Sequence, residues 1–208
     1  MENIKDKKVF VAGCGGLGCY IVENLIRMQV GKIVVCDGDI FSESNLNRQL
    51  YSRPGTINEL KVKVAKMRAE ALEYKGEFKV YDTYLNEENI SEMIKGCDIA
   101  IDALDNTQAR FILEDACTKE GMPLVHGAVG EWNYQIAVSM PGSNLLHSIY
   151  QGMEMQNEIP TFAFTVQVCA ASETAEAVKL LAKEKSELEN SLLIADLKHN
   201  TYEIIKMA

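Results

Sequence analysis

Short runs of apolar residues alternate along the chain with segments in which apolar residues recur every three or four positions. A short apolar run is typical of a buried strand, and the three-to-four spacing is typical of an amphipathic helix. The pattern predicts six strands, at residues 7–13, 32–37, 78–85, 97–104, 123–129 and 133–140. It predicts helices among them at residues 16–28, 57–71, 87–95 and 106–119.

The order of these elements predicts the fold class. Strands that alternate with helices of roughly ten to fifteen residues are typical of a largely parallel sheet with helices on both faces. Further along, a helix is predicted over residues 168–188, and residues 191–207 read as two strands around a turn at His199 and Asn200. We therefore expect an α/β fold with a doubly wound, mostly parallel, Rossmann-like sheet and antiparallel C-terminal strands.

The chain is predicted to form a single domain, residues 1–208, because it has an ordinary domain length and no repeat or linker-like tract. We expect a core over residues 1–140, a crossover loop over 141–165, and a C-terminal helix and hairpin over 166–208. The alternation is lost between residues 140 and 161. A connection of that length without regular structure is a candidate functional segment.

A glycine cluster lies directly after the first predicted strand and opens the first predicted helix. Gly13, Gly15 and Gly18 fit the pattern G-x-G-x-x-G in the strand–turn–helix setting that a phosphate-binding turn needs. Gly13 allows the tight turn, Gly15 lets the backbone approach a phosphate, and Gly18 lets helix and strand pack closely. Gly16 removes one more side chain on the nucleotide side. A turn without a ligand remains the alternative, and the turn alone does not distinguish ATP from a dinucleotide.

Acidic residues follow two of the predicted strands. Asp37 ends the second strand. A carboxylate at this position suits the ribose diol of either NAD or ATP. The alternative is a strand-end aspartate that caps a turn. Asp102 and Asp105 end the fourth strand. Asp105 lies beyond the last apolar residue, where a carboxylate beside ATP phosphates is a natural magnesium partner. It also suits the N-cap of the next helix.

Cationic residues follow the second strand. If Asn45 begins a short helix, Asn45 and Arg48 share one face, with Gln49 adjacent. Arg48 then suits the β- and γ-phosphates of ATP, and Lys61 suits the charge that develops at the α-phosphate. A surface arginine and a solvated lysine are the alternatives. A dinucleotide has no evident use for these two cations.

Topology predicts that these groups converge. In an open wound sheet, ligands bind beyond the carboxyl ends of the strands. The glycine turn, Asp37 and Asp105 follow the first, second and fourth strands, while Arg48 and Lys61 come from the segment after the second. Together they suit one ATP–magnesium complex in one crevice. An NAD oxidoreductase would leave Arg48, Lys61 and Asp105 unexplained.

The motifs resemble those of the ThiF/MoeB/HesA adenylyltransferases, relatives of the ubiquitin-activating enzymes, and most of all the short, divergent ThiF group associated with thiamine biosynthesis. The resemblance is carried by GCGGLG (13–18), DGD (37–39), SNLNRQ (44–49), Lys61 and ALDN (103–106). It implies adenylation, with ATP and release of pyrophosphate, of the C-terminal glycine carboxylate of a ubiquitin-like sulfur-carrier protein of the ThiS or MoaD type.

The resemblance also implies the site. Asn106 and the turn glycines contact the nucleotide, Asp37 the ribose, and Asp105 the magnesium. Asn45, Arg48 and Lys61 hold phosphates, and Arg48, Lys61 and Asp105 are the catalytic residues. A homodimer is implied as well.

The sequence departs from the family in three ways. It starts close to its first strand, so we expect it to lack the N-terminal arginine segment of many relatives. It has no C-x-x-C pair, so no zinc is expected, and its crossover loop has no cysteine for a covalent step. Two alternatives stay open: a cyclase that adenylates a carboxylate on a tRNA base, and a nucleotide-binding scaffold with reduced turnover.

Composition narrows the class of protein. The net charge of −9 argues against a nucleic-acid partner, which needs a basic face. The apolar runs are too short for a membrane span, and the charged start MENIKDKK has no signal peptide, so we expect a cytoplasmic protein. Three of the six cysteines fall in or beside predicted buried strands and turns, where a cysteine is expected to pack as a small apolar residue.

Overall fold

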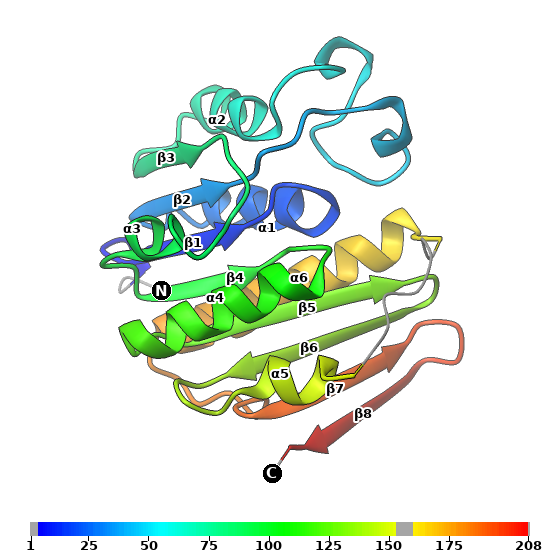
Figure 1. Cartoon of the computed structure of the whole chain (residues 1–208). Helices are drawn as coiled ribbons and strands as arrows, with labels where there is room; N and C mark the ends of the chain where they lie inside the picture. The colour runs from blue at the N-terminus through cyan, green and yellow to red at the C-terminus, as the bar shows by residue number, and fades with distance from the viewer. Residues whose placement is uncertain (1–3, 153–159, 208) are drawn as a thin grey trace.

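The computed structural model describes residues 4–152 and 160–207 and contains one eight-stranded sheet with helices on both faces (Figure 1). The sheet order is β3-β2-β1-β4-β5-β6-β7-β8. The strands are β1 (Lys8–Ala12), β2 (Lys32–Cys36), β3 (Glu77–Tyr81), β4 (Ile99–Asp102), β5 (Leu124–Gly130), β6 (Asn133–Ser139), β7 (Ser191–Asp196) and β8 (Thr201–Lys206). The helices are α1 (Gly16–Arg27), α2 (Lys61–Ala71), α3 (Ile90–Ile94), α4 (Thr107–Glu120), α5 (Leu145–Tyr150) and α6 (Ala163–Leu181).

Strands β1 to β5 are parallel, and their register aligns three strand ends. Ala12, the last residue of β1, pairs with Cys36 at the end of β2 and with Asp102 at the end of β4. The segments that follow these three strands therefore start at the same edge of the sheet (Figure 1). This edge is where the sequence predicts the crevice.

The other half of the sheet is antiparallel, as predicted. β5 and β6 form a hairpin with only Glu131 and Trp132 between the paired residues Gly130 and Asn133. β7 pairs with β6 and with β8, and the β7–β8 connection includes Asn200, in the left-handed conformation. The expected fold class, a Rossmann-like sheet with antiparallel C-terminal strands, is confirmed.

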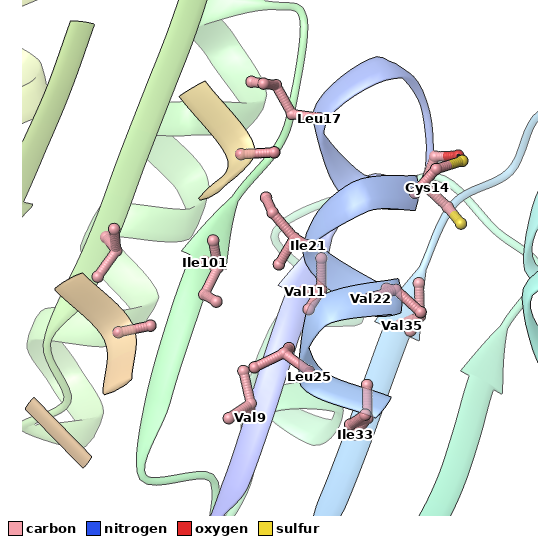
Figure 2. Close-up of a cluster of buried hydrophobic side chains, with 14 of the residues drawn as sticks. Val9, Val11, Cys14, Leu17, Ile21, Val22, Leu25, Ile33, Val35 and Ile101 are labelled. Carbon is pink, nitrogen blue, oxygen red and sulfur yellow. The ribbon is translucent and has the colours of Figure 1, made fainter. Parts of the chain in front are cut away.

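Two layers of helices cover the sheet. α1, α2 and α6 pack on one face and contribute to one buried apolar cluster, while α3, α4 and α5 pack on the other. Figure 2 shows how α1 covers the centre: Ile21 and Leu25 lie beside Val9 and Val11 of β1. All four side chains are fully buried, so the start of α1 is fixed firmly against the end of β1.

Several boundaries differ from the sequence prediction. β3 ends at Tyr81 instead of residue 85, and α3 covers Ile90–Ile94 instead of 87–95. α6 covers residues 163–181 instead of 168–188, because Phe162 and Phe164 are exposed and hide the start of its pattern, and Lys183 takes a left-handed conformation that ends it. α2 begins at Lys61, four residues later than predicted. The crossover loop contains helix α5, while its residues 153–159 lie outside the described part of the chain.

Candidate functional site

The glycine turn sits between the ends of β2 and β4. The Gly13 amide donates to the carbonyl of Cys36 at 2.8 Å, and the Ala103 amide donates to the carbonyl of Ala12 at 2.8 Å. The turn then leads directly into α1, whose N-cap is Gly15. No side chain caps this helix end, so its first amides remain available to an anion.

The four glycines of the turn divide into two kinds. A Cβ at Gly13 would lie 2.5 Å from the carbonyl oxygen of Ala103, and one at Gly18 would lie 2.1 Å from that of Gly13. These two glycines are required by packing. A Cβ at Gly15 or Gly16 would meet nothing closer than 3.7 Å, in the side chains of Gln49 and Val166. The packing of the chain does not explain why Gly15 and Gly16 lack side chains.

Asp37 joins the glycine turn to the end of β2. Its Oδ2 accepts the Cys14 amide at 2.6 Å, and its Oδ1 accepts the Asp39 amide at 2.8 Å. Burial raises the pKa of Asp37, although the Lys61 ammonium and the two amides oppose this effect. The turn-capping role that the sequence left open is therefore present in the structure, and the side chain lies beside the glycine turn.

Lys61 is buried, in contrast to the solvated lysine that its place off the apolar stripe suggested. It is 6% exposed, and its Nζ donates to Oδ2 of Asp39 at 2.9 Å. Burial lowers the pKa of Lys61, but the carboxylates of Asp37 and Asp39 outweigh burial and raise the pKa above its ordinary value. Lys61 therefore carries a permanent positive charge next to Asp37.

The SNLNRQ segment has a different local structure from the one predicted. The short helix is a 3-10 turn over Glu43–Asn45, so Asn45 ends it and does not begin it. The buried Asn45 side chain accepts the Ser42 amide at 3.0 Å, because that amide needs a partner at the start of the turn. Arg48 is half-buried, and its side chain donates to the Ser44 carbonyl at 3.0 Å. Among the described residues, no ion pair of Arg48 is found.

Gln49, next to Arg48, is the one residue of this segment with an unsatisfied group. It is 7% exposed, and its Oε1 has no hydrogen-bond partner within the described residues. Its Nε2 would lie 3.7 Å from a Cβ at Gly15. A buried, unpaired polar atom beside a bare glycine at a helix start fits a site that a polar ligand completes.

Asp105 and Asn106 follow β4 on the same edge. Asn106 is the N-cap of α4, and its side chain accepts the Ala109 amide at 2.8 Å. The N-cap role considered for Asp105 is therefore wrong, because Asn106 fills it. Asp105 is exposed, in the loop between β4 and α4.

Asp102 is buried, unlike the exposed Asp105. It is fully buried and contacts Nδ1 of His126 at 2.7 Å and Nε of Arg110 at 3.4 Å. The other ring nitrogen of His126 lies 3.0 Å from the Tyr150 hydroxyl. Burial lowers the pKa of His126, against the effect of Asp102, so the ring is neutral. This network, which sequence reasoning missed, ties α4 and α5 to the sheet below the site.

Five of the six cysteines are buried, and Cys97 is partly buried. Cys14, Cys19 and Cys169 are fully buried, and Cys169 lies in α6 as expected. Within residues 4–152 and 160–207, no group of His, Cys, Asp and Glu is arranged to hold a metal ion alone. In the same residues, no helix has the length and apolar character needed to cross a membrane.

Comparison with known proteins identifies the family. The ThiF family matches residues 1–208. The chain belongs to the ThiF family. It is 29% identical over 209 residues to the SAMP-activating enzyme E1 of Haloferax volcanii, which covers 98% of this chain and 77% of that protein. It is 31% identical over 194 residues to the sulfur carrier protein ThiS adenylyltransferase of Bacillus subtilis, which covers 89% of this chain and 57% of that protein.

Solved structures show the same fold. E. coli MccB with ATP aligns with all of this ThiF-family chain at a TM-score of 0.86 and 20% identity. The chain spans 65% of that protein, so it covers less than two thirds of both MccB and the Bacillus relative. The resemblance inferred from the glycine turn, DGD, SNLNRQ and ALDN motifs is confirmed, and the family is one of adenylyltransferase enzymes.

Proposed function

We propose that this ThiF-family chain, as a single domain, binds ATP with Mg²⁺ at the edge where β1, β2 and β4 end and transfers AMP to a carboxylate. The observation that carries the proposal is the alignment of Ala12, Cys36 and Asp102, which starts the glycine turn and the Asp37 and Asp105 segments at one level. The buried ammonium of Lys61 supplies positive charge there.

The residues fit ATP. Gly15 and Gly16 lack side chains without a packing reason, and the uncapped start of α1 offers amides to phosphate. Arg48 and Lys61 would hold the phosphates together with Asn45, and Asp37 would hold the ribose, with Asn106 nearby. Mg²⁺ commonly binds one or two carboxylates plus substrate phosphates, so the single carboxylate of Asp105 suffices.

The proposed acceptor is the C-terminal glycine carboxylate of a small ubiquitin-like sulfur-carrier protein, which becomes an acyl-adenylate as pyrophosphate leaves. The names of the Bacillus relative and of the sulfur carrier protein adenylyltransferase of Thermus thermophilus, 35% identical over 137 residues, support this choice. Such a reaction needs no side-chain nucleophile. The site would act by positioning and by neutralising charge on the phosphates. We extend the proposal to a cytoplasmic homodimer.

ATP–pyrophosphate exchange with carriers that end in Gly-Gly tests the proposal. Arg48→Ala is expected to abolish exchange while the circular dichroism spectrum and Tm stay close to those of the wild type, because the hydrogen bonds of the Arg48 side chain go to Ser44 and Asn47 of its own segment. Lys61→Met is expected to lower exchange at least about a hundredfold, as for loss of one electrostatic stabiliser. Lys63→Met is the matched control, since Lys63 is exposed on the same helix and pairs with Glu59.

Two outcomes would contradict the proposal. Tight ATP binding without exchange for any carrier would indicate a scaffold. Normal exchange by Arg48→Ala would remove Arg48 from the phosphate site.

A further inference from the structure

Tyr84, in the loop between β3 and α3, lies against the DGD segment. It is 67% exposed, yet its hydroxyl donates to Oδ1 of Asp39 at 2.5 Å. The contact depends on Gly38: a Cβ there would lie 2.8 Å from the Tyr84 backbone nitrogen and 2.9 Å from its ring. The glycine of DGD is therefore explained by the close approach of Tyr84.

The other oxygen of Asp39 holds Lys61. Lys61 Nζ donates to Asp39 Oδ2 at 2.9 Å, and the Lys61 amide donates to the Asp39 carbonyl at 3.0 Å. Both carboxylate oxygens of Asp39 are thus engaged, one by a phenol and one by an ammonium. A carboxylate bound on both sides cannot rotate without breaking a charge-assisted hydrogen bond.

A hydrogen bond from a residue that follows Tyr84 in the chain fixes its backbone. Its carbonyl accepts Nδ2 of Asn89 at 2.9 Å, and the Asn89 side chain also accepts the Asn86 amide at 2.9 Å. The Asp39 carboxylate raises the pKa of Tyr84, and the more distant carboxylates of Asp37 and Asp105 add to this effect. The phenol therefore stands within electrostatic range of the loops that follow both β2 and β4.

We propose that Tyr84 is a positioning residue for Lys61: its hydroxyl fixes Asp39, and Asp39 fixes the Lys61 ammonium at the phosphate side of the crevice. The inference rests on the proposed ATP function. One of the three N–H groups of the Lys61 ammonium donates to Asp39, so two remain to donate to phosphate oxygens. Lys61 then meets the triphosphate without first having to become ordered.

The chain of contacts predicts a coupled effect on ATP affinity. Tyr84→Phe keeps the ring and removes the donor, so Kd for Mg·ATP is expected to rise by about three- to tenfold, the range for one lost hydrogen bond. Asp39→Asn is expected to weaken binding further. In an Asp39→Asn background, Tyr84→Phe is expected to raise Kd for Mg·ATP by less than about twofold, because the phenol acts through Asp39.

A pH series gives a second readout. The titratable groups that face Lys61 are the carboxylates of Asp37 and Asp39 and the thiol of Cys14. Removing the negative charge of Asp39 lowers the pKa of Lys61, so ATP binding by Asp39→Asn is expected to fail at lower pH than in the wild type. Loss of structure alone would not move this limit.

The experiment is calorimetric titration of the full chain with Mg·ATP, with Tm measured for each variant. Tyr202→Phe is the matched control, because Tyr202 is a comparably exposed tyrosine, 60% exposed, on β8 at the opposite edge of the sheet. It should bind ATP as the wild type does. Supporting results are weaker binding by Tyr84→Phe at unchanged Tm and loss of that effect in Asp39→Asn.

Three results would overturn the inference. Equal Kd values for wild type and Tyr84→Phe would show that the phenol has no role, although the ATP function would stand. A full Tyr84→Phe effect in the Asp39→Asn background would mean that the hydroxyl contacts the nucleotide directly. No ATP binding by the wild type would instead refute the proposed function itself.

Discussion

The two kinds of glycine in the turn predict opposite outcomes for the same substitution. A Cβ at Gly18 would lie 2.1 Å from the Gly13 carbonyl oxygen and 2.8 Å from the carbonyl carbon. A relaxed carbon–oxygen contact is about 3.3 Å, so the two atoms must separate by about 1.2 Å. The obstacle is backbone, and α1 is fixed by Ile21 and Leu25, so neither side yields easily.

This overlap sets the size of the effect. Overpacking costs about 1–3 kcal/mol, and the upper end applies here because the obstacle is backbone. The higher helix propensity of alanine relative to glycine offsets less than about 1 kcal/mol of this loss in stability. For a domain of this length, about 2–4 °C of Tm is lost per kcal/mol. Gly18→Ala is therefore expected to lower Tm by roughly 5–10 °C.

Gly16→Ala is the matched partner. Its Cβ would lie 3.7 Å from Val166, which is an ordinary contact, and it adds alanine to the first turn of α1. Stability is expected to stay constant or rise slightly. Since a helical Cβ tilts toward the N-terminus, where the phosphates would bind, Mg·ATP affinity is expected to fall about tenfold.

Thermal unfolding followed by circular dichroism, together with ATP titration, measures both effects. If Gly18→Ala kept the wild-type Tm, the packing argument would be wrong. If Gly16→Ala bound ATP normally, Gly16 would not belong to the nucleotide site.

Two further predictions concern buried polar groups. Burial raises the pKa of Glu173 well above its ordinary range, so the stability linked to its protonated form is complete at acid pH and is lost as pH rises through the native pKa. The urea midpoint of Glu173→Gln should therefore rise relative to that of the wild type as pH rises. A difference between the two midpoints that does not change with pH would contradict this. Tyr150→Phe removes the hydroxyl that lies 3.0 Å from His126 Nε2, and urea unfolding should show a loss of about 1 kcal/mol. Gln135 Nε2 lies 3.1 Å from the same ring nitrogen, so a loss near zero would mean that Gln135 satisfies the ring by itself.

The parts of the fold that could be predicted depend on local pattern. Buried parallel strands read as continuous apolar runs, so β1, β2 and β4 were visible in the sequence. The glycine turn was visible because Gly13 and Gly18 must lack side chains wherever a strand leads so tightly into a helix. By contrast, the start of α6 was missed, because the exposed Phe162 and Phe164 break the expected pattern.

The missed parts of the site depend on contacts between distant residues. Lys61 is buried because Asp39, 22 positions earlier, neutralises it. Tyr84 reaches Asp39 across 45 positions, and nothing near Tyr84 in the sequence marks it. Asp102 was placed only at the end of its strand, and its contacts with His126 and Arg110 could not be read from the sequence. The only local signal for Asp39 was its place two residues after Asp37.

The change from parallel to antiparallel pairing within the sheet has a consequence for the order of folding. In the β5–β6 hairpin, Gly130 pairs with Asn133, three positions away, whereas β1 pairs with β4 through Val9 and Ile99, ninety positions apart. Closing the longer loop costs more entropy, so we expect the hairpin to form first and the β1–β4 pair late. Pulsed hydrogen exchange during refolding should then protect amides of β6 before those of β1. The edge where β1, β2 and β4 end, which is the proposed nucleotide site, would be among the last parts of the molecule to assemble, and ATP bound there would act on the final step of folding.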